Sequence, residues 1–131
     1  MILRRIAIAA LMVGAIAVGA TVAAQPPQDQ PAAVIKMTSS RRFDPAQVTI
    51  KVGQTVEWIN TTDQVHTVTD DPRRAHAPAD ATLPQGAQPF NSGSLKRGQT
   101  FRHTFTVPGT YRYFCLPHEE QHMVGVVVVQ P

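Results

Sequence analysis

Residues 108–129 read PGTYRYFCLPHEEQHMVGVVVV, a stretch that holds two β-type runs and the loop between them. Pro108-Gly109 is a turn pair, and the run that follows it ends at Cys115, the only cysteine of the chain. The loop at 116–123 then leads into the valine-rich run at 124–129. Valines without polar alternation are typical of a strand that is buried on both faces, or nearly so. A loop pinned at both ends by such strands can hold its side chains in fixed positions.

Other short β-type runs precede this stretch, with turn residues between them. They lie at 34–38, 47–52, 55–59, 65–69 and 100–107. Many short strands with turns between them are typical of an all-β sandwich or barrel, which is the fold class we predict. The interval 70–89 is long for a loop in a compact domain and is therefore expected to be functional or mobile. Within it, Asp71-Pro72 predicts one helical turn over 73–77, ended by Pro78.

The first 24 residues have the composition of a cleaved secretory signal peptide. Two arginines precede an uncharged apolar run at 6–22, and small residues at its end suit signal-peptidase cleavage. An uncleaved membrane anchor is the alternative, although the run is at the short end of the roughly 20 residues that span a bilayer. We therefore expect a periplasmic or otherwise exported protein without stable membrane insertion. A flexible leader at 25–32 would be followed by one domain at 33–131.

Charge excludes one class of partner for the mature chain. Removing the two arginines of residues 1–24 from the 12 basic residues leaves 10, against 9 acidic ones. A formal charge of +1 does not provide the basic surface that nucleic-acid binding requires. We expect a monomer that does not bind nucleic acid.

Cys115 is accompanied by residues of the types that bind copper. His118 and Met123 follow it in the same loop, and His66 lies in the strand-like run at 65–69. Thiolate and thioether are soft ligands and imidazole is intermediate, a mixture that suits copper cycling between two oxidation states. One cysteine cannot form a disulfide within an exported chain, so metal ligation also explains its presence. The alternative is a core cysteine with unrelated histidines.

On these residues the chain resembles the cupredoxins, the small blue copper proteins. The spacing Cys115-x2-His118-x4-Met123, with His66 upstream, is similar to that of plastocyanin and pseudoazurin. The resemblance extends from 43–45 to the terminal valines. It implies a Greek-key β-sandwich or barrel of the cupredoxin type, with a long loop insertion around 70–89 and a tyrosine corner at Tyr111.

The resemblance also implies a role for each residue of the site. His66, Cys115 and His118 would be the equatorial copper ligands, and Met123 would be the long axial ligand. His118 would turn one ring edge toward the surface as the electron port. Phe114 would point outward and offer a second electron route. An apolar rim for partner docking would consist of Val65, Leu116 and Pro117.

Two positions depart from the family pattern. Thr67 follows the first histidine, where Asn is common in the family, so we expect its backbone N–H to donate to the sulfur of Cys115 while its side chain braces the site less well. His122 precedes Met123, where Gly is common. We expect an exposed His122 in a left-handed conformation, with a competing copper ligand as the alternative.

Other polar residues receive simpler interpretations. His103 is expected to be a partly buried core residue and His76 a solvated loop residue. Arg73 and Arg74 either steer an acidic partner or keep the 70–89 loop soluble. Glu119 and Glu120 would place negative charge beside the docking rim.

The expected function is one-electron transport outside the cytoplasm by a single type 1 copper ion. Partners would be larger redox proteins, such as a cytochrome, dehydrogenase, reductase or oxidase, that dock near His118. No paired carboxylates or nucleophile–base pair indicate an enzyme. The alternatives are a copper-handling protein for storage, delivery or resistance, which would use the same ligands, and a metal-free adhesive β-sandwich.

Overall fold

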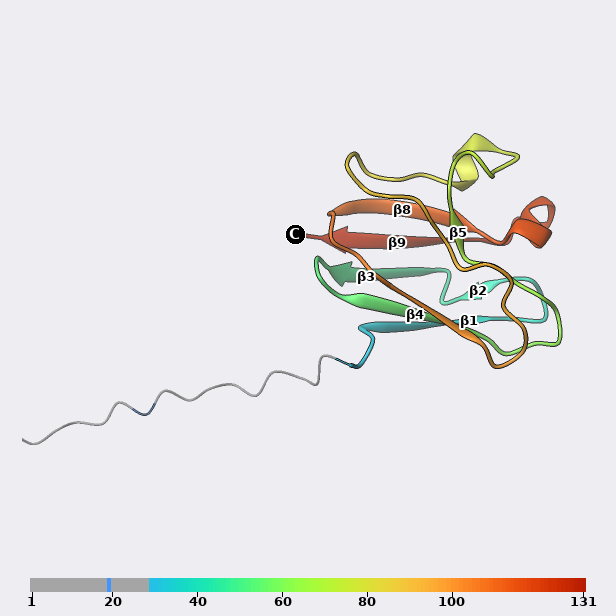
Figure 1. The fold of residues 1–131 in the computed structure, drawn as a ribbon, viewed down its shortest axis with the longest axis horizontal. Coiled ribbons are helices and arrows are strands. Elements are labelled where there is room, and N and C mark those ends of the chain that lie inside the picture. Colours follow the sequence, from blue (N-terminus) through green and yellow to red (C-terminus); the bar gives the residue numbers. More distant parts are fainter. Residues whose placement is uncertain (1–18, 20–28) are drawn as a thin grey trace, which may run out of the picture.

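The computed structural model describes residues 19 and 29–131, where the chain forms two β-sheets packed into a sandwich (Figure 1). Apart from residue 19, the predicted signal peptide lies outside the described residues, and so do residues 25–28 of the predicted leader. Within the described part, no helix is both long and apolar enough to cross a membrane. The predicted all-β class is confirmed.

One sheet has the strand order β2-β1-β4-β7. These strands are β1 (Ala33–Met37), β2 (Phe43–Asp44), β4 (Thr55–Asn60) and β7 (Thr100–Thr104). The second sheet has the order β3-β9-β8-β5-β6. Its strands are β3 (Gln47–Lys51), β5 (Thr69–Asp70), β6 (Phe90–Asn91), β8 (Gly109–Phe114) and β9 (Val124–Gln130). Parallel pairing of β1 with β4 and of β3 with β9 joins strands that are distant in sequence.

Aromatic side chains from both sheets meet in the core around Trp58. Its ring centroid lies 5.4 Å from that of Tyr113 and 5.8 Å from that of Phe101. On β9, Gly125 faces the hydroxyl end of Tyr113 so closely that any side chain there would collide with it. This fit ties β8 to β9, the two strands that flank the loop containing Cys115.

The predicted tyrosine corner is present. The hydroxyl of Tyr111 donates to the backbone oxygen of Val107 at 2.7 Å. This bond fixes the entry into β8, and therefore the position at which Cys115 leaves the sheet.

Some strand predictions were wrong in extent. Of the predicted run at 65–69, only Thr69 lies in a strand, the two-residue β5, while His66 makes an isolated bridge to Leu95. The strand predicted at 100–107 ends at Thr104. In β9, Val127 and Val129 are buried and the alternate valines are half-buried. The short strands β2 and β6 were not predicted, because two residues carry no detectable alternation.

The helical turn predicted over 73–77 was wrong. Asp71 instead closes a tight turn, in which its backbone oxygen accepts from the N–H of Arg74 at 2.9 Å. The short 3-10 helix η1 (Pro78–Asp80) begins at Pro78, the residue expected to end a helix. Proline is favoured at the first position of a helix because its missing N–H is not needed there. In Figure 1 this segment, coloured yellow, lies beside β8 at the end of the sandwich away from the C-terminus.

Candidate metal centre

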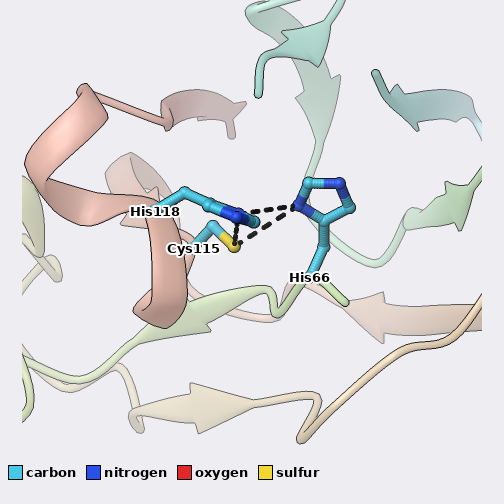
Figure 2. Close-up of side chains that lie close together, drawn as sticks. All are labelled: His66, Cys115 and His118. Atoms are coloured by element: carbon cyan, nitrogen blue, oxygen red, sulfur yellow. Dashed lines mark hydrogen bonds between the residues drawn. The ribbon is translucent and has the colours of Figure 1, made fainter. Parts of the chain in front are cut away.

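Three of the four expected ligands converge at one end of the sandwich (Figure 2). The Sγ atom of Cys115 lies 3.7 Å from Nδ1 of His66 and 3.5 Å from Nδ1 of His118. The two Nδ1 atoms are 3.2 Å apart. Cys115 and His66 are fully buried and His118 is half-buried. His66 comes from one segment of the chain and Cys115 and His118 from another, so the fold brings the two segments together.

The spacing of these atoms fits a first-row metal ion. A point equidistant from the corners of the triangle would lie about 2.0 Å from each, close to typical metal–nitrogen distances of about 2.0–2.1 Å and metal–sulfur distances of about 2.3 Å. Two imidazoles with one thiolate form the trigonal donor set found in blue copper sites. The donor chemistry and the geometry therefore both suit copper.

Met123 lies in the same loop, at its junction with β9. Its backbone oxygen accepts from the N–H of Cys115 at 3.0 Å, and its own N–H donates to the oxygen of His118 at 3.2 Å. Its side chain is fully buried. These two bonds close the loop that contains the short helix η2 (Leu116–Gln121), so Cys115, His118 and Met123 keep fixed relative positions.

A hydrogen-bonded chain that was not predicted orients the His66 ring. Nε2 of His66 lies 3.1 Å from Oγ1 of Thr62, and that hydroxyl lies 3.0 Å from Oδ1 of Asn60. With the hydroxyl donating to Asn60, it accepts the Nε2–H of His66 and leaves Nδ1 free to bind a metal. Asn60 is itself anchored by donating to the backbone oxygens of Gln64 and Leu95. Threonine is too common in β-proteins for sequence alone to identify this role.

Thr67 contributes more than was expected of it. As predicted, its backbone N–H donates to Sγ of Cys115, at 3.3 Å. Its side chain also joins the two ligand segments, because Oγ1 accepts from the N–H of Leu116 at 2.8 Å and is 3.0 Å from Oγ1 of Thr69. The side chain of Thr67 therefore links both ligand segments.

Burial keeps the donors in their neutral forms before metal binds. It lowers the pKa of His66 to about 4, with smaller contributions from the charges of His118 and Arg41. Burial also lowers the pKa of His118, again with a contribution from Arg41, and raises that of the Cys115 thiol. Neutral imidazoles are ready to bind a cation, whereas the thiol releases its proton when metal binds.

Two expectations about neighbouring side chains were wrong. Phe114 is fully buried rather than outward-facing. The 70–89 segment lies beside β8, since Thr82 bridges to Arg112 and Asp80 lies 3.7 Å from the same arginine. Glu119 is only 4 % exposed, and its Oε1 accepts from the N–H of Ala77 at 3.0 Å. Glu119 therefore links the loop 116–123 to the 70–89 segment, and its carboxylate does not add negative charge to the docking rim.

The remaining histidines lie outside the cluster, as expected. His122 is exposed and adopts the left-handed conformation, with φ of 56°. His103 is half-buried and stacks on Phe90 with a centroid distance of 4.2 Å, and His76 is exposed. Arg73 and Arg74 both pair with Asp71, which weakens the case that they steer a partner.

The sandwich and the donor set together define a cupredoxin-type copper protein. The sequence matches the model of the copper binding proteins of the plastocyanin/azurin family over residues 32–130. The chain belongs to this family, and copper is its cofactor.

Curated relatives and solved structures agree with this assignment. The chain is 34% identical over 88 residues to plastocyanin from Scenedesmus fuscus, covering 67% of this chain and 86% of the relative. It is 31% identical over 121 residues to amicyanin from Paracoccus denitrificans, covering 89% and 83%. A solved structure of an oxidised amicyanin variant superposes with a TM-score of 0.58 at 30% identity, covering 76% of this chain and 82% of that one.

The hydrogen bond between Thr62 and His66 leads to a first prediction. Thr62→Val removes the hydroxyl with little change in shape, so the His66 ring loses its acceptor at Nε2. We expect copper affinity to fall by about 10-fold to 100-fold, the usual effect of losing a group that orients a metal ligand. Competition with a copper chelator measures this. Thr62→Ser keeps the hydroxyl and should bind nearly as tightly as wild type, whereas equal losses in both variants would contradict this role.

Proposed function

We propose that the protein is an exported one-electron carrier with a single type 1 copper ion. His66, Cys115 and His118 would be its equatorial ligands and Met123 its weak axial ligand. The observation that carries the proposal is the buried triangle of donor atoms, already at metal-binding spacing within a braced frame. Copper bound there supplies the change between Cu(I) and Cu(II).

The chain contributes rigidity to this chemistry. Thr62 orients His66, Thr67 joins the two ligand segments, and backbone bonds close the loop from Cys115 to Met123. Since Cu(I) and Cu(II) prefer different geometries, a frame that follows neither reduces the rearrangement that accompanies each electron.

The electron would enter and leave at His118. This ligand is half-buried, whereas His66 and Cys115 are fully buried, so His118 gives the shortest contact with another protein. Phe114 does not offer a second exit, because its side chain is fully buried. Partners would be larger redox proteins that dock over the exposed part of His118.

A non-enzymatic role agrees with the family and with the nature of the site. The four proposed ligands fill the coordination positions of the metal, which leaves no position for a substrate. Likeness to plastocyanin and amicyanin favours a carrier over copper storage or delivery. We assign residues 1–24 to a cleaved export signal and residues 33–131 to the copper domain.

Reversible redox titration of the copper-loaded chain tests the carrier function. We expect an intense blue oxidised form that is bleached by one electron per copper and recovers fully over repeated cycles with the metal retained. A storage or delivery protein would instead release the ion on changing valence. Loss of copper into a chelator during one cycle would contradict the carrier function.

A further inference from the structure

We propose that the redox partner presents an acidic face, and that it docks over His118 with its carboxylates against Arg41 and Arg42. This inference rests on the proposed carrier function and adds the chemistry of the partner. The two arginines belong to the turn 38–42 between β1 and β2, here called the arginine turn. Sequence reasoning assigned this turn no role in the site.

The structure places the arginine turn against both ligand segments. Nε of Arg41 donates to Oε1 of Gln64 at 3.3 Å, two residues before His66 in the chain. An Nη1–H of Arg42 donates to the backbone oxygen of Gln121 at 3.3 Å, in the loop that contains His118.

Arg41 and Arg42 differ from the other arginines of the described chain in lacking a carboxylate partner. The remaining five each lie within 4.0 Å of an Asp or Glu oxygen: Arg73, Arg74, Arg97, Arg102 and Arg112. The bonds of Arg41 and Arg42 go to neutral amide oxygens, and both residues are exposed. Their charges are therefore available to a partner.

The backbone closes the arginine turn, because the N–H of Arg41 donates to the oxygen of Thr38 at 3.0 Å. Arg41 has φ of 58°, a left-handed conformation that glycine adopts more freely than a residue with a Cβ. The closed turn fixes the backbone from which both arginine side chains extend.

The surroundings complete a surface suited to an acidic redox protein. Val65 is 43% exposed, Pro117 is exposed and Leu116 is half-buried, which gives an apolar centre beside His118. Because Glu119 is buried, Glu120 is the one exposed carboxylate of the loop 116–123. The two positive charges of Arg41 and Arg42 exceed the single negative charge of Glu120. Apolar centres with a charged rim are typical of transient docking surfaces, where the rim charges set the association rate and the choice of partner.

Stopped-flow electron transfer with two protein probes of opposite charge tests the proposal. The probes are an acidic [2Fe–2S] ferredoxin and a basic c-type cytochrome, each mixed with the copper-loaded chain. Arg41→Gln and Arg42→Gln should each slow the reaction with ferredoxin by about 2-fold to 5-fold at low salt, and the effect should fade as salt screens the charges. Lys51→Gln removes one charge from β3 outside the site and should leave the rate within about 1.5-fold of wild type.

The blue band and the reduction potential of each variant establish that its copper site is intact. Equal rates for the arginine variants and wild type with ferredoxin at low salt would overturn the acidic partner while leaving the carrier function standing. A wild-type rate that falls with salt for the basic cytochrome, but not for ferredoxin, would overturn it as well. Failure of the wild type to cycle with small redox mediators would instead remove the proposed function, and this inference with it.

Discussion

Cys115→Ser is expected to abolish the intense blue colour of the copper-loaded protein and to weaken copper binding by at least about 100-fold. The thiolate is the soft ligand of the set, and its Sγ atom lies within 3.7 Å of both imidazole nitrogens. A serine hydroxyl is a hard ligand that stays protonated near neutral pH. Visible spectra and a chelator competition measure both effects.

His122→Ala is the matched control for this loss. His122 lies next to Met123 in the same loop, but it is exposed and outside the cluster of donors. The control variant should therefore keep the colour and the affinity. If His122→Ala bleached the protein, or if Cys115→Ser stayed blue, the ligand assignment would be wrong.

Asp70→Asn is expected to stabilise the fold by about 2–4 kcal/mol at pH 8, or a rise in Tm of roughly 10–20 °C. Asp70 is fully buried, and neither of its carboxylate oxygens has a hydrogen-bond partner. Burial, with a smaller contribution from the charge of Asp71, raises its pKa to about 8. Asparagine keeps the shape and cannot ionise.

The pH dependence follows from this shift. In the unfolded chain the pKa of Asp70 is about 3.9, so between about pH 4 and pH 8 the folded state holds a proton that the unfolded state has released. The stability that Asp70 contributes is full below pH 4 and is lost as the pH rises toward 8. The pKa of His66 is shifted in the opposite direction. Protonation of this buried histidine lowers the stability of the fold at acid pH, and that stability is regained as the pH rises from about 4 to 6.5.

Urea unfolding of wild type and Asp70→Asn at pH 6.5, 8 and 9 isolates the Asp70 contribution, because the histidine contribution is the same in both proteins. Wild type should lose about 2 kcal/mol between pH 6.5 and 8, and Asp70→Asn should not. Asp63→Asn, which alters an exposed ion pair with Arg97, should change stability by less than about 1 kcal/mol at every pH. Parallel curves for wild type and Asp70→Asn would show that Asp70 ionises normally in the fold.

Sequence reasoning succeeded where the chemistry of a side chain is distinctive. A lone cysteine, two histidines and a methionine at family spacing predicted the site, and the structure brings His66, Cys115 and His118 together. The tyrosine corner at Tyr111 was also recognisable, because it follows a turn pair at the start of a strand.

Sequence reasoning failed where the burial of a side chain depends on contacts with a distant part of the chain. Alternation along β8 places Phe114 on the face opposite the core residue Tyr113, but it cannot show that Phe114 is buried there as well. Glu119 was expected in solvent for the same reason, since nothing in its neighbours predicts a bond to the N–H of Ala77. Long-range contacts of an irregular segment leave no periodic signal.

Sequence reasoning also missed residues that support the site but belong to no recognisable motif. Thr62 and Arg41 come from segments without a motif, and only the fold brings them to the metal centre. Candidate ligands of such a site can be named from sequence, whereas the groups that orient them and the charges that surround them require coordinates.

The fold, rather than the metal, sets the positions of the donor atoms. Crystal structures of the copper-loaded protein in both oxidation states test it most directly. We predict that Nδ1 of His66, Nδ1 of His118 and Sγ of Cys115 each move by less than about 0.5 Å between Cu(II) and Cu(I). Departure of either imidazole from the metal in the reduced form would contradict the account.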